Sequence, residues 1–134
     1  MTSSKKSFNK VLHYLVIGTG GALGAMLRFF AHTRISALTG PGFPWGTLLI
    51  NISGSFFLGV LVVILSARGP AVDLLRSGLC IGLLGGFTTF SAFSVETLSL
   101  LEAEQWQRAL VNIVSSVLLC LLGAAAGVAA ARQF

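Results

Sequence analysis

Charge is scarce in this sequence. Charged residues make up 10 % of its 134 residues, whereas hydrophobic residues make up 54 %. A soluble domain carries about 25 % charged residues, and a soluble protein with so few charges could not cover its surface with polar groups. We therefore expect lipid to face most of the chain. The net charge of +5 does not predict nucleic-acid binding, because the basic residues are scattered and form no cluster.

Cysteine, histidine and catalytic groupings are sparse as well. Cys80 and Cys120 lie in apolar runs without metal-ligand spacing, so we interpret both as small buried hydrophobic residues and predict no disulfide framework. His13 and His32 lie near the ends of apolar segments, and we interpret both as interfacial. Since the sequence contains no nucleophile–base pair and no metal-ligand set, it does not predict an enzyme.

Four apolar segments are long enough to cross a membrane. A helix needs about 20 apolar residues to span a hydrocarbon core of about 30 Å. The segments cover residues 11–30, 47–66, 79–101 and 109–131, and short linkers join them. We interpret the polar, basic start of the chain as a retained tail. We therefore predict an all-α membrane protein, a single domain over residues 1–134, with four transmembrane helices and both termini on one side.

Basic residues do not fix the orientation of these helices. The predicted side that holds the termini carries Lys5, Lys6, Lys10, Arg68, Arg76 and Arg132. The other side carries Arg28, Arg34 and Arg108. Without the three lysines of the tail, three basic residues face three, so the positive-inside rule predicts no preferred orientation. This balance hints that the chain inserts both ways.

Glycines recur four residues apart in three of the segments. The pairs are Gly20 and Gly24, Gly78 and Gly82, Gly82 and Gly86, and Gly123 and Gly127. This spacing lets helix backbones approach closely. We expect tight helix packing and a partner chain, because four helices of one small chain leave little room for a pore among themselves.

The third segment does not have the pattern of a simple transmembrane helix. Its middle, residues 85–91, reads GGFTTFS, and adjacent glycines followed by threonines make a poor helix interior. Irregular backbone at membrane depth is tolerated only where it is buried in protein or lines a cavity. Its free carbonyl groups can bind a cation and its free amide groups an anion. Two interpretations stay open: a packed kink between close helices, or an ion site.

Aromatic rings and hydroxyl groups share one predicted face after this interruption. Phe90, Phe93, Ser94 and Thr97 follow the i, i+3, i+4, i+7 spacing. The face is either packed core or the wall of a narrow anion path. Hydroxyl groups donate hydrogen bonds, and the edge of an aromatic ring is positive. A small, strongly hydrated anion needs such groups to replace its water.

Polar residues also recur at helical spacing in the second and fourth segments. They are Thr47, Asn51 and Ser55 in the second, and Asn112, Ser116 and Cys120 in the fourth. An asparagine within a membrane is costly and usually has a partner or a role. Asn112 is close enough to the start of its segment to be interfacial, whereas Ser116 lies deeper.

One acidic residue, Glu96, lies within an apolar segment. An intramembrane acid is a candidate functional group, but Glu96 is near the end of its segment, so a structural role is equally open. Arg28 ends the first segment. It can extend to the headgroups, pair with Glu96, or hold an anion at a vestibule.

Three segments together resemble the fluoride channel family known as Fluc or CrcB. They are residues 20–28 (GGALGAMLR), 45–55 (WGTLLINISGS) and 85–96 (GGFTTFSAFSVE), in the family's order and with its loop lengths. The resemblance implies a passive, fluoride-selective channel in a bacterial inner membrane, which exports fluoride from the cytoplasm and relieves fluoride toxicity. It also implies a homodimer of two chains in opposite orientations, with two anion pores along the interface.

The resemblance, read with the patterns above, assigns residues to two ion sites. The ion pathway comprises Phe90, Phe93, Asn51, Thr47, Ser91, Ser94, Ser116 and Arg28. A structural sodium ion at the dimer centre would be held by the backbone carbonyls of Gly85 and Thr88. The partners implied are a second copy of the chain, the fluoride ion and the lipid bilayer.

Two other classes of membrane protein each match only part of the sequence pattern. A small multidrug exporter of the four-helix, dual-topology kind would match the size and composition, but it needs a buried carboxylate in its first helix, and residues 11–30 contain no Asp or Glu. A non-transporting assembly subunit would explain the glycine spacing but not the clustered hydroxyl and amide groups. Coupled fluoride–proton exchange would need a proton relay, and Glu96 stands alone.

Overall fold

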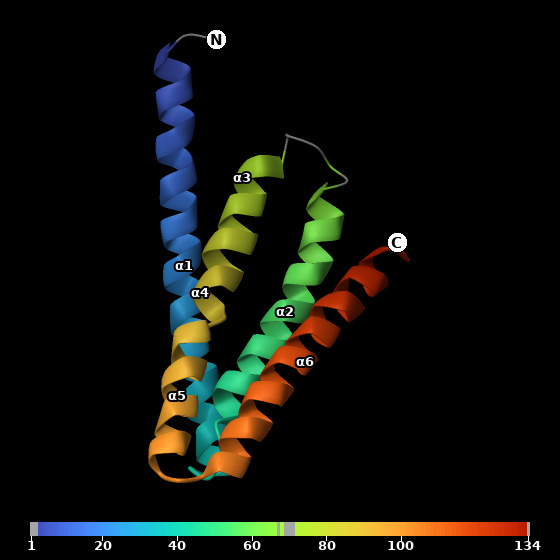
Figure 1. Ribbon diagram of the computed structural model, residues 1–134. Coiled ribbons are helices and arrows are strands. Elements are labelled where there is room, and N and C mark those ends of the chain that lie inside the picture. Colours follow the sequence, from blue (N-terminus) through green and yellow to red (C-terminus); the bar gives the residue numbers. More distant parts are fainter. Residues whose placement is uncertain (1–2, 67, 69–71, 134) are drawn as a thin grey trace.

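The computed structural model describes residues 3–66, 68 and 72–133, and all regular structure within them is helical (Figure 1). The elements are α1 (Ser3–Thr39), α2 (Trp45–Ser66), α3 (Asp73–Arg76), the π-helical segment η2 (Ser77–Leu84), α4 (Gly85–Phe87), α5 (Phe90–Glu102) and α6 (Trp106–Ala131). The segments α3, η2 and α4 follow one another directly along the chain. Together with α5 they occupy the place of the third predicted helix.

Four helical stretches are long and apolar enough to cross a membrane, which confirms the predicted number. They are Ser7–Thr39, Trp45–Ser66, Asp73–Glu102 and Trp106–Ala131. The first extends beyond the predicted residue 30, because a charged residue such as Arg28 does not end a helix. Gly40 does: it adopts φ +74° and its N–H donates to the Ser36 carbonyl at 3.0 Å, a left-handed C-terminal cap.

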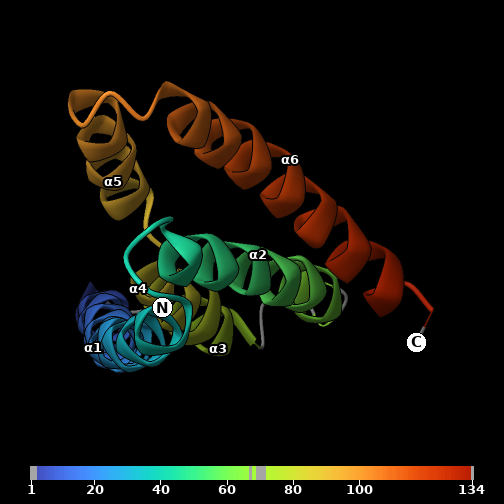
Figure 2. The same ribbon diagram turned by 90° about the horizontal axis from the view of Figure 1, so that it is seen from below.

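The helices form two closely packed pairs. α1 packs against η2 and α4, and α2 packs along α6. Figure 2 shows α2 lying between α6 and the pair formed by α1 and α3. The view also shows α5 set away from the line of α4, on the side toward the start of α6.

Backbone contact at glycines holds both pairs together. A Cβ atom on Gly82 would lie 2.8 Å from the Ile17 carbonyl oxygen of α1, and one on Gly123 would lie 3.0 Å from the Ile52 carbonyl oxygen of α2. Tight packing at these glycines is therefore confirmed. However, the glycines face helices of their own chain, so their spacing is no argument for a partner chain.

The buried core is small, and many large apolar side chains are exposed. The buried hydrophobic residues are Leu48, Ile50, Leu65, Leu84, Phe93, Ala109 and Ala131. Exposed side chains include Met26, Phe29, Leu121 and Leu122, each at least 64 % exposed. Such a surface suits a chain whose outer faces contact lipid or another protein rather than water.

The backbone between α4 and α5 is extended at two residues. Thr88 has φ −81° and ψ 156°, and Thr89 has φ −153° and ψ 118°. The Thr88 N–H still donates to the Leu84 carbonyl at 3.0 Å. This is the last helical hydrogen bond before α5, because the Thr89 N–H donates to a side chain instead. The Thr89 hydroxyl then accepts from the Ala92 N–H at 3.2 Å and caps the start of α5.

Candidate functional site

Asn51 of α2 binds the backbone of the interruption, the two extended residues Thr88 and Thr89 between α4 and α5. Its Nδ2 donates to the Thr89 carbonyl at 2.9 Å, and its Oδ1 accepts from the Thr89 N–H at 2.8 Å. In a continuous α-helix that N–H would donate to the Gly85 carbonyl. One side-chain amide therefore satisfies both backbone groups of Thr89, a residue that is only 9 % exposed. Buried backbone groups require such partners.

A cavity of about 380 Å³, the break cavity, lies beside the interruption. It is lined by Asn51, Ser55, Leu58, Thr88, Thr89, Phe90, Phe93, Ser116, Val117, Cys120 and Leu121. None of these lining residues carries a charge, while several offer hydroxyl or amide groups. The rings of Phe90 and Phe93 lie with centroids 5.3 Å apart and planes inclined by 47°.

The break cavity brings together part of the predicted pathway. Phe90, Phe93, Asn51 and Ser116 all line it. The predicted common face after the interruption is divided, because Phe93 and Thr97 are buried, whereas Phe90 is 77 % exposed.

Two predicted hydroxyl groups do not line the break cavity. The Ser91 hydroxyl lies 3.1 Å from the Thr89 hydroxyl. The exposed Ser94 donates back to the Phe90 carbonyl at 2.9 Å.

Arg28 and Thr47 line a second cavity of about 330 Å³, the middle cavity, between α1, α2 and α5. Thr89 borders both this cavity and the break cavity. Arg28 Nη1 contacts the Thr88 carbonyl oxygen at 3.4 Å, a long hydrogen bond. Arg28 therefore contacts the backbone of the interruption, a role that we did not predict, and among the described residues it forms no ion pair with Glu96. The other two predicted roles, at the headgroups or at an anion, stay predictions.

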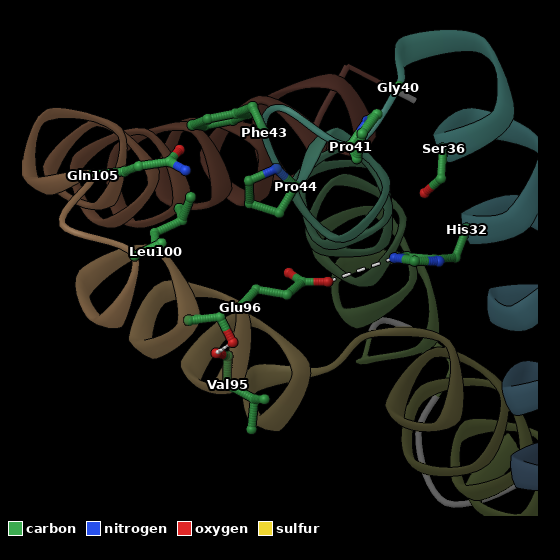
Figure 3. A pocket seen from close by; sticks show the side chains of 12 residues that line it. His32, Ser36, Gly40, Pro41, Phe43, Pro44, Val95, Glu96, Leu100 and Gln105 are labelled. Carbon is green, nitrogen blue, oxygen red and sulfur yellow. Dashed lines mark hydrogen bonds and ion pairs between the residues drawn. The ribbon is translucent and has the colours of Figure 1, made fainter.

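Glu96 pairs with His32 and Thr47 instead. Thr47 Oγ1 donates to Glu96 Oε1 at 2.6 Å, and His32 Nε2 lies 3.5 Å from the same oxygen. Figure 3 shows the contact between His32 and Glu96 in a cavity of about 530 Å³, the outer cavity. Ser36, Phe43 and Gln105 also line this cavity. His32 and Glu96 border both the outer and the middle cavity.

His32 is the residue that our sequence reasoning missed. We interpreted it as interfacial, and it is partly exposed, but its ring faces the one acid within the apolar segments. A usable signal was its position four residues after Arg28, which places the imidazole and the guanidinium on one helix face.

Asn112 is buried within the protein, with 1 % of its surface exposed. Its Nδ2 donates to Thr97 Oγ1 at 2.9 Å, and that hydroxyl donates to the Phe93 carbonyl at 2.7 Å. The chain of bonds ties α6 to α5 beside a ring of the break cavity. Asn112 therefore has a structural partner that accounts for its burial.

Of the predicted sodium ligands, Gly85 is the first residue of α4 and Thr88 follows its last residue. Among the described residues no group of three or more His, Cys, Asp or Glu side chains could hold a metal ion. A cation near the interruption would therefore depend on carbonyl oxygens. The Gly85 carbonyl lacks its usual helical donor, because the Thr89 N–H donates to Asn51.

Comparison with known proteins places this arrangement in a family. Residues 15–128 match the family described as CrcB-like protein, Camphor Resistance (CrcB). A protein of Geobacter sulfurreducens named fluoride-specific ion channel FluC is 45 % identical over 89 % of this chain and 96 % of its own length. Proteins of the same name from Rhizobium meliloti and Magnetococcus marinus are 44 % and 43 % identical, over 90 % and 87 % of this chain and 96 % and 94 % of their own lengths. The chain therefore belongs to the CrcB-like protein family.

Proposed function

We propose that this multi-pass protein of the bacterial membrane is a passive, fluoride-selective ion channel that exports fluoride from the cytoplasm and so relieves fluoride toxicity. The observation that carries the proposal is the break cavity: an uncharged space lined by hydroxyl groups, an amide and two phenyl rings beside interrupted backbone. Relatives of 43–45 % identity that carry the name fluoride-specific ion channel support the same function.

The chemistry of the break cavity suits a small anion. The Asn51 amide has two N–H donors, and one of them is used on the Thr89 carbonyl, so the other is available. Ser116 adds a hydroxyl, and the edges of Phe90 and Phe93 carry partial positive charge. Such donors can replace the water of a fluoride ion, and they favour fluoride over chloride because the smaller ion concentrates its charge and accepts stronger hydrogen bonds. Since no carboxylate lines this cavity, it offers no group that could carry protons against the ion, and passive flow is the simpler mechanism.

We propose that the ion passes through the outer, middle and break cavities in turn. Glu96 and His32 border the first two, and Thr89 borders the last two. In the middle cavity Arg28 supplies positive charge. The hydroxyl groups of Thr47 and Ser94 donate to Glu96 and to the Phe90 carbonyl in this structure, so each would have to turn from that partner to donate to a passing ion. Ser91 adds a further hydroxyl group at the start of α5.

The proposed pathway needs a second copy of the chain. Phe90 is 77 % exposed although it lines the break cavity, so a single chain leaves the cavity open on that side. A partner inserted in the opposite orientation would cover it. The equal count of basic residues on the two sides, once the N-terminal tail is set apart, supports insertion in both orientations.

A structural sodium ion at the dimer centre is part of the proposal. The Gly85 and Thr88 carbonyls are hard oxygen ligands of the kind such cations take, and Gly85 has lost its helical donor to Asn51. Arg28 contacts the Thr88 carbonyl, so its guanidinium would have to share that oxygen with the ion. Two carbonyls are too few ligands for such a cation, so carbonyls from both chains are needed. Thr88→Ala should keep sodium binding, because the side chain is not the ligand; loss of binding by a folded dimer would contradict this.

Growth in fluoride tests the proposed function directly. A bacterium whose own fluoride exporter has been deleted should grow in sodium fluoride when it expresses this chain, and an empty vector should not rescue it. An equal concentration of sodium chloride is the control for osmotic and sodium effects. Failure to rescue by protein shown to be in the membrane would refute the proposal.

A further inference from the structure

We propose that His32 is a positioning residue that makes anion access to the pathway pH-dependent, because its protonation neutralises the Glu96 carboxylate in the outer cavity. The inference rests on the proposed function, since it concerns how anions reach the same path. It predicts faster fluoride flow on the acidic side of neutrality.

The His32 ring is held in place by the first turn of α2. A Cβ atom on Gly46 would lie 2.7 Å from His32 Cδ2 and 3.2 Å from both His32 Nε2 and Ser36 Oγ. The ring therefore occupies the space that a side chain at position 46 would fill. Figure 3 shows it reaching from α1 toward Glu96 on α5.

Glu96 is incompletely paired in this arrangement. Its Oε1 accepts from Thr47 at 2.6 Å, but its Oε2 is buried and has no hydrogen-bond partner among the residues that the structure describes. His32 Nε2 is 3.5 Å from Oε1, slightly beyond a good hydrogen bond. A charged donor forms shorter and stronger bonds to a carboxylate than a neutral one, so protonation would draw the two groups together.

Few other charged groups act on this pair. Arg28, on the same helix as His32, lines the middle cavity but contacts the Thr88 carbonyl. From α2, Gly46 and Thr47 face the pair, and neither titrates in the physiological range. Among the described residues that line the outer cavity, Glu96 and His32 are the titratable ones. Arg108 of α6 donates to the side chain of Gln105, another lining residue, at 2.8 Å, but an arginine stays charged across this pH range and adds no pH dependence.

The charge of the outer cavity therefore depends on His32. When the imidazole is neutral, the Glu96 carboxylate leaves the outer cavity negative and repels anions. When it is protonated, the pair is electrically balanced. Histidine changes charge between about pH 5 and pH 8, and one charge near an entrance can alter the local anion concentration about fivefold.

The test is the pH profile of fluoride efflux from liposomes, with efflux from protein-free liposomes subtracted at each pH because hydrogen fluoride crosses lipid unaided. Wild-type efflux should rise about fivefold between about pH 8 and about pH 5.5. His32→Gln should remove the rise, since glutamine keeps a donor but does not titrate. His32→Lys should give high efflux at every pH.

His13→Gln is the matched control, because His13 contacts Ser77 Oγ at 2.9 Å and lines none of the three cavities. This variant should keep the wild-type slope. A slope retained by His32→Gln, or no slope in a conducting wild type, would overturn the inference and leave the proposed function intact. Wild-type protein that conducts no fluoride at any pH would overturn both.

Discussion

At the scale of single residues, Thr89 is the point on which the site depends. Its two backbone groups bind the Asn51 amide, its hydroxyl caps α5, and it borders two cavities. An interruption without such partners would leave polar groups unsatisfied in an apolar environment, which costs several kcal/mol per group. The same contacts that make the interruption stable therefore also fix the geometry of the candidate pathway.

Replacing the phenyl rings of the break cavity tests their proposed role. Phe90→Ile and Phe93→Ile keep apolar bulk but remove the positive ring edge, so we expect each to lower fluoride flux at least about tenfold. Such apolar swaps usually cost less than about 1.5 kcal/mol of stability, so the fold should survive. Flux is measured from liposomes, after size-exclusion chromatography has shown an intact dimer.

Phe87→Ile is the matched control for these variants. Phe87 is absent from the lining of the break cavity, and a Cβ atom on Gly54 of α2 would lie 3.3 Å from its ring. We expect a smaller effect on flux from this change. Wild-type flux in both Phe90→Ile and Phe93→Ile would mean that the rings are only packing groups, and the path would then depend on Asn51 and Ser116.

The residue patterns singled out several polar and aromatic residues that line the break cavity, but they did not single out His32 in the outer cavity. Asn51, Ser116, Phe90 and Phe93 stood out because polar or aromatic side chains recurred at helical spacing within apolar segments. His32 did not, since a histidine near a helix end has an ordinary explanation at the membrane surface. Its contact with Glu96 depends on how α1 packs on α2 and α5, which no local pattern encodes.

At the scale of helices, close backbone contact decides at which glycines a side chain would disturb the packing. Gly85 and Gly86 are adjacent but differ in their surroundings. A Cβ atom on Gly86 would lie 3.0 Å from the Gly21 Cα atom of α1, whereas the nearest atom to one on Gly85 is the Cys80 carbonyl oxygen at 3.7 Å. Only Gly86 therefore needs to lack a side chain for α4 to pack within this chain.

We expect Gly86→Ala to destabilise the protein by about 1–3 kcal/mol, because the added methyl group would force α4 away from α1. Gly85→Ala, its neighbour, should be tolerated and even favoured slightly by helix propensity. Thermal unfolding in detergent compares the two variants. Equal stability of both would show that the contact between α4 and α1 is not as close as described.

The sequence was sufficient to place the four helices but not their ends or local form. Apolar length predicts a membrane-spanning helix well, whereas the true end of α1 depends on the left-handed conformation of Gly40. The π-helical form of η2 was not predicted either. Its residues Ser77–Leu84 have no hydrophobic periodicity that separates a π-helix from an α-helix, and its geometry follows from packing against α1.

At the scale of the whole molecule, the proposed second copy would have to cover faces that a single chain leaves open. The chain has a small core and broad apolar faces, and the glycines spaced four residues apart contact helices of their own chain. The proposed interface would therefore be formed mainly by other side chains, of which Phe90 is the most exposed among the residues that line the break cavity. Sequence alone could not separate glycines that pack within a chain from those that pack between chains, because both use the same spacing.

The proposed insertion of the chain in both orientations can be tested by labelling. Gln133 follows α6 and is exposed, so Gln133→Cys should react with a membrane-impermeant maleimide in intact cells at roughly half the extent seen in lysed cells, as near-equal insertion predicts. The unmodified chain, which retains Cys80 and Cys120, gives the background. Labelling that is complete or absent in intact cells would show a single orientation.

The most direct test of the central claim is ion selectivity of the purified protein. Liposomes that contain only this chain, loaded with fluoride or with chloride, should release fluoride rapidly when a counter-ion pathway is opened and should retain chloride. The reason is the break cavity, whose uncharged hydroxyl and amide groups form stronger hydrogen bonds to the smaller ion. Release of chloride at a rate comparable to that of fluoride would contradict the account.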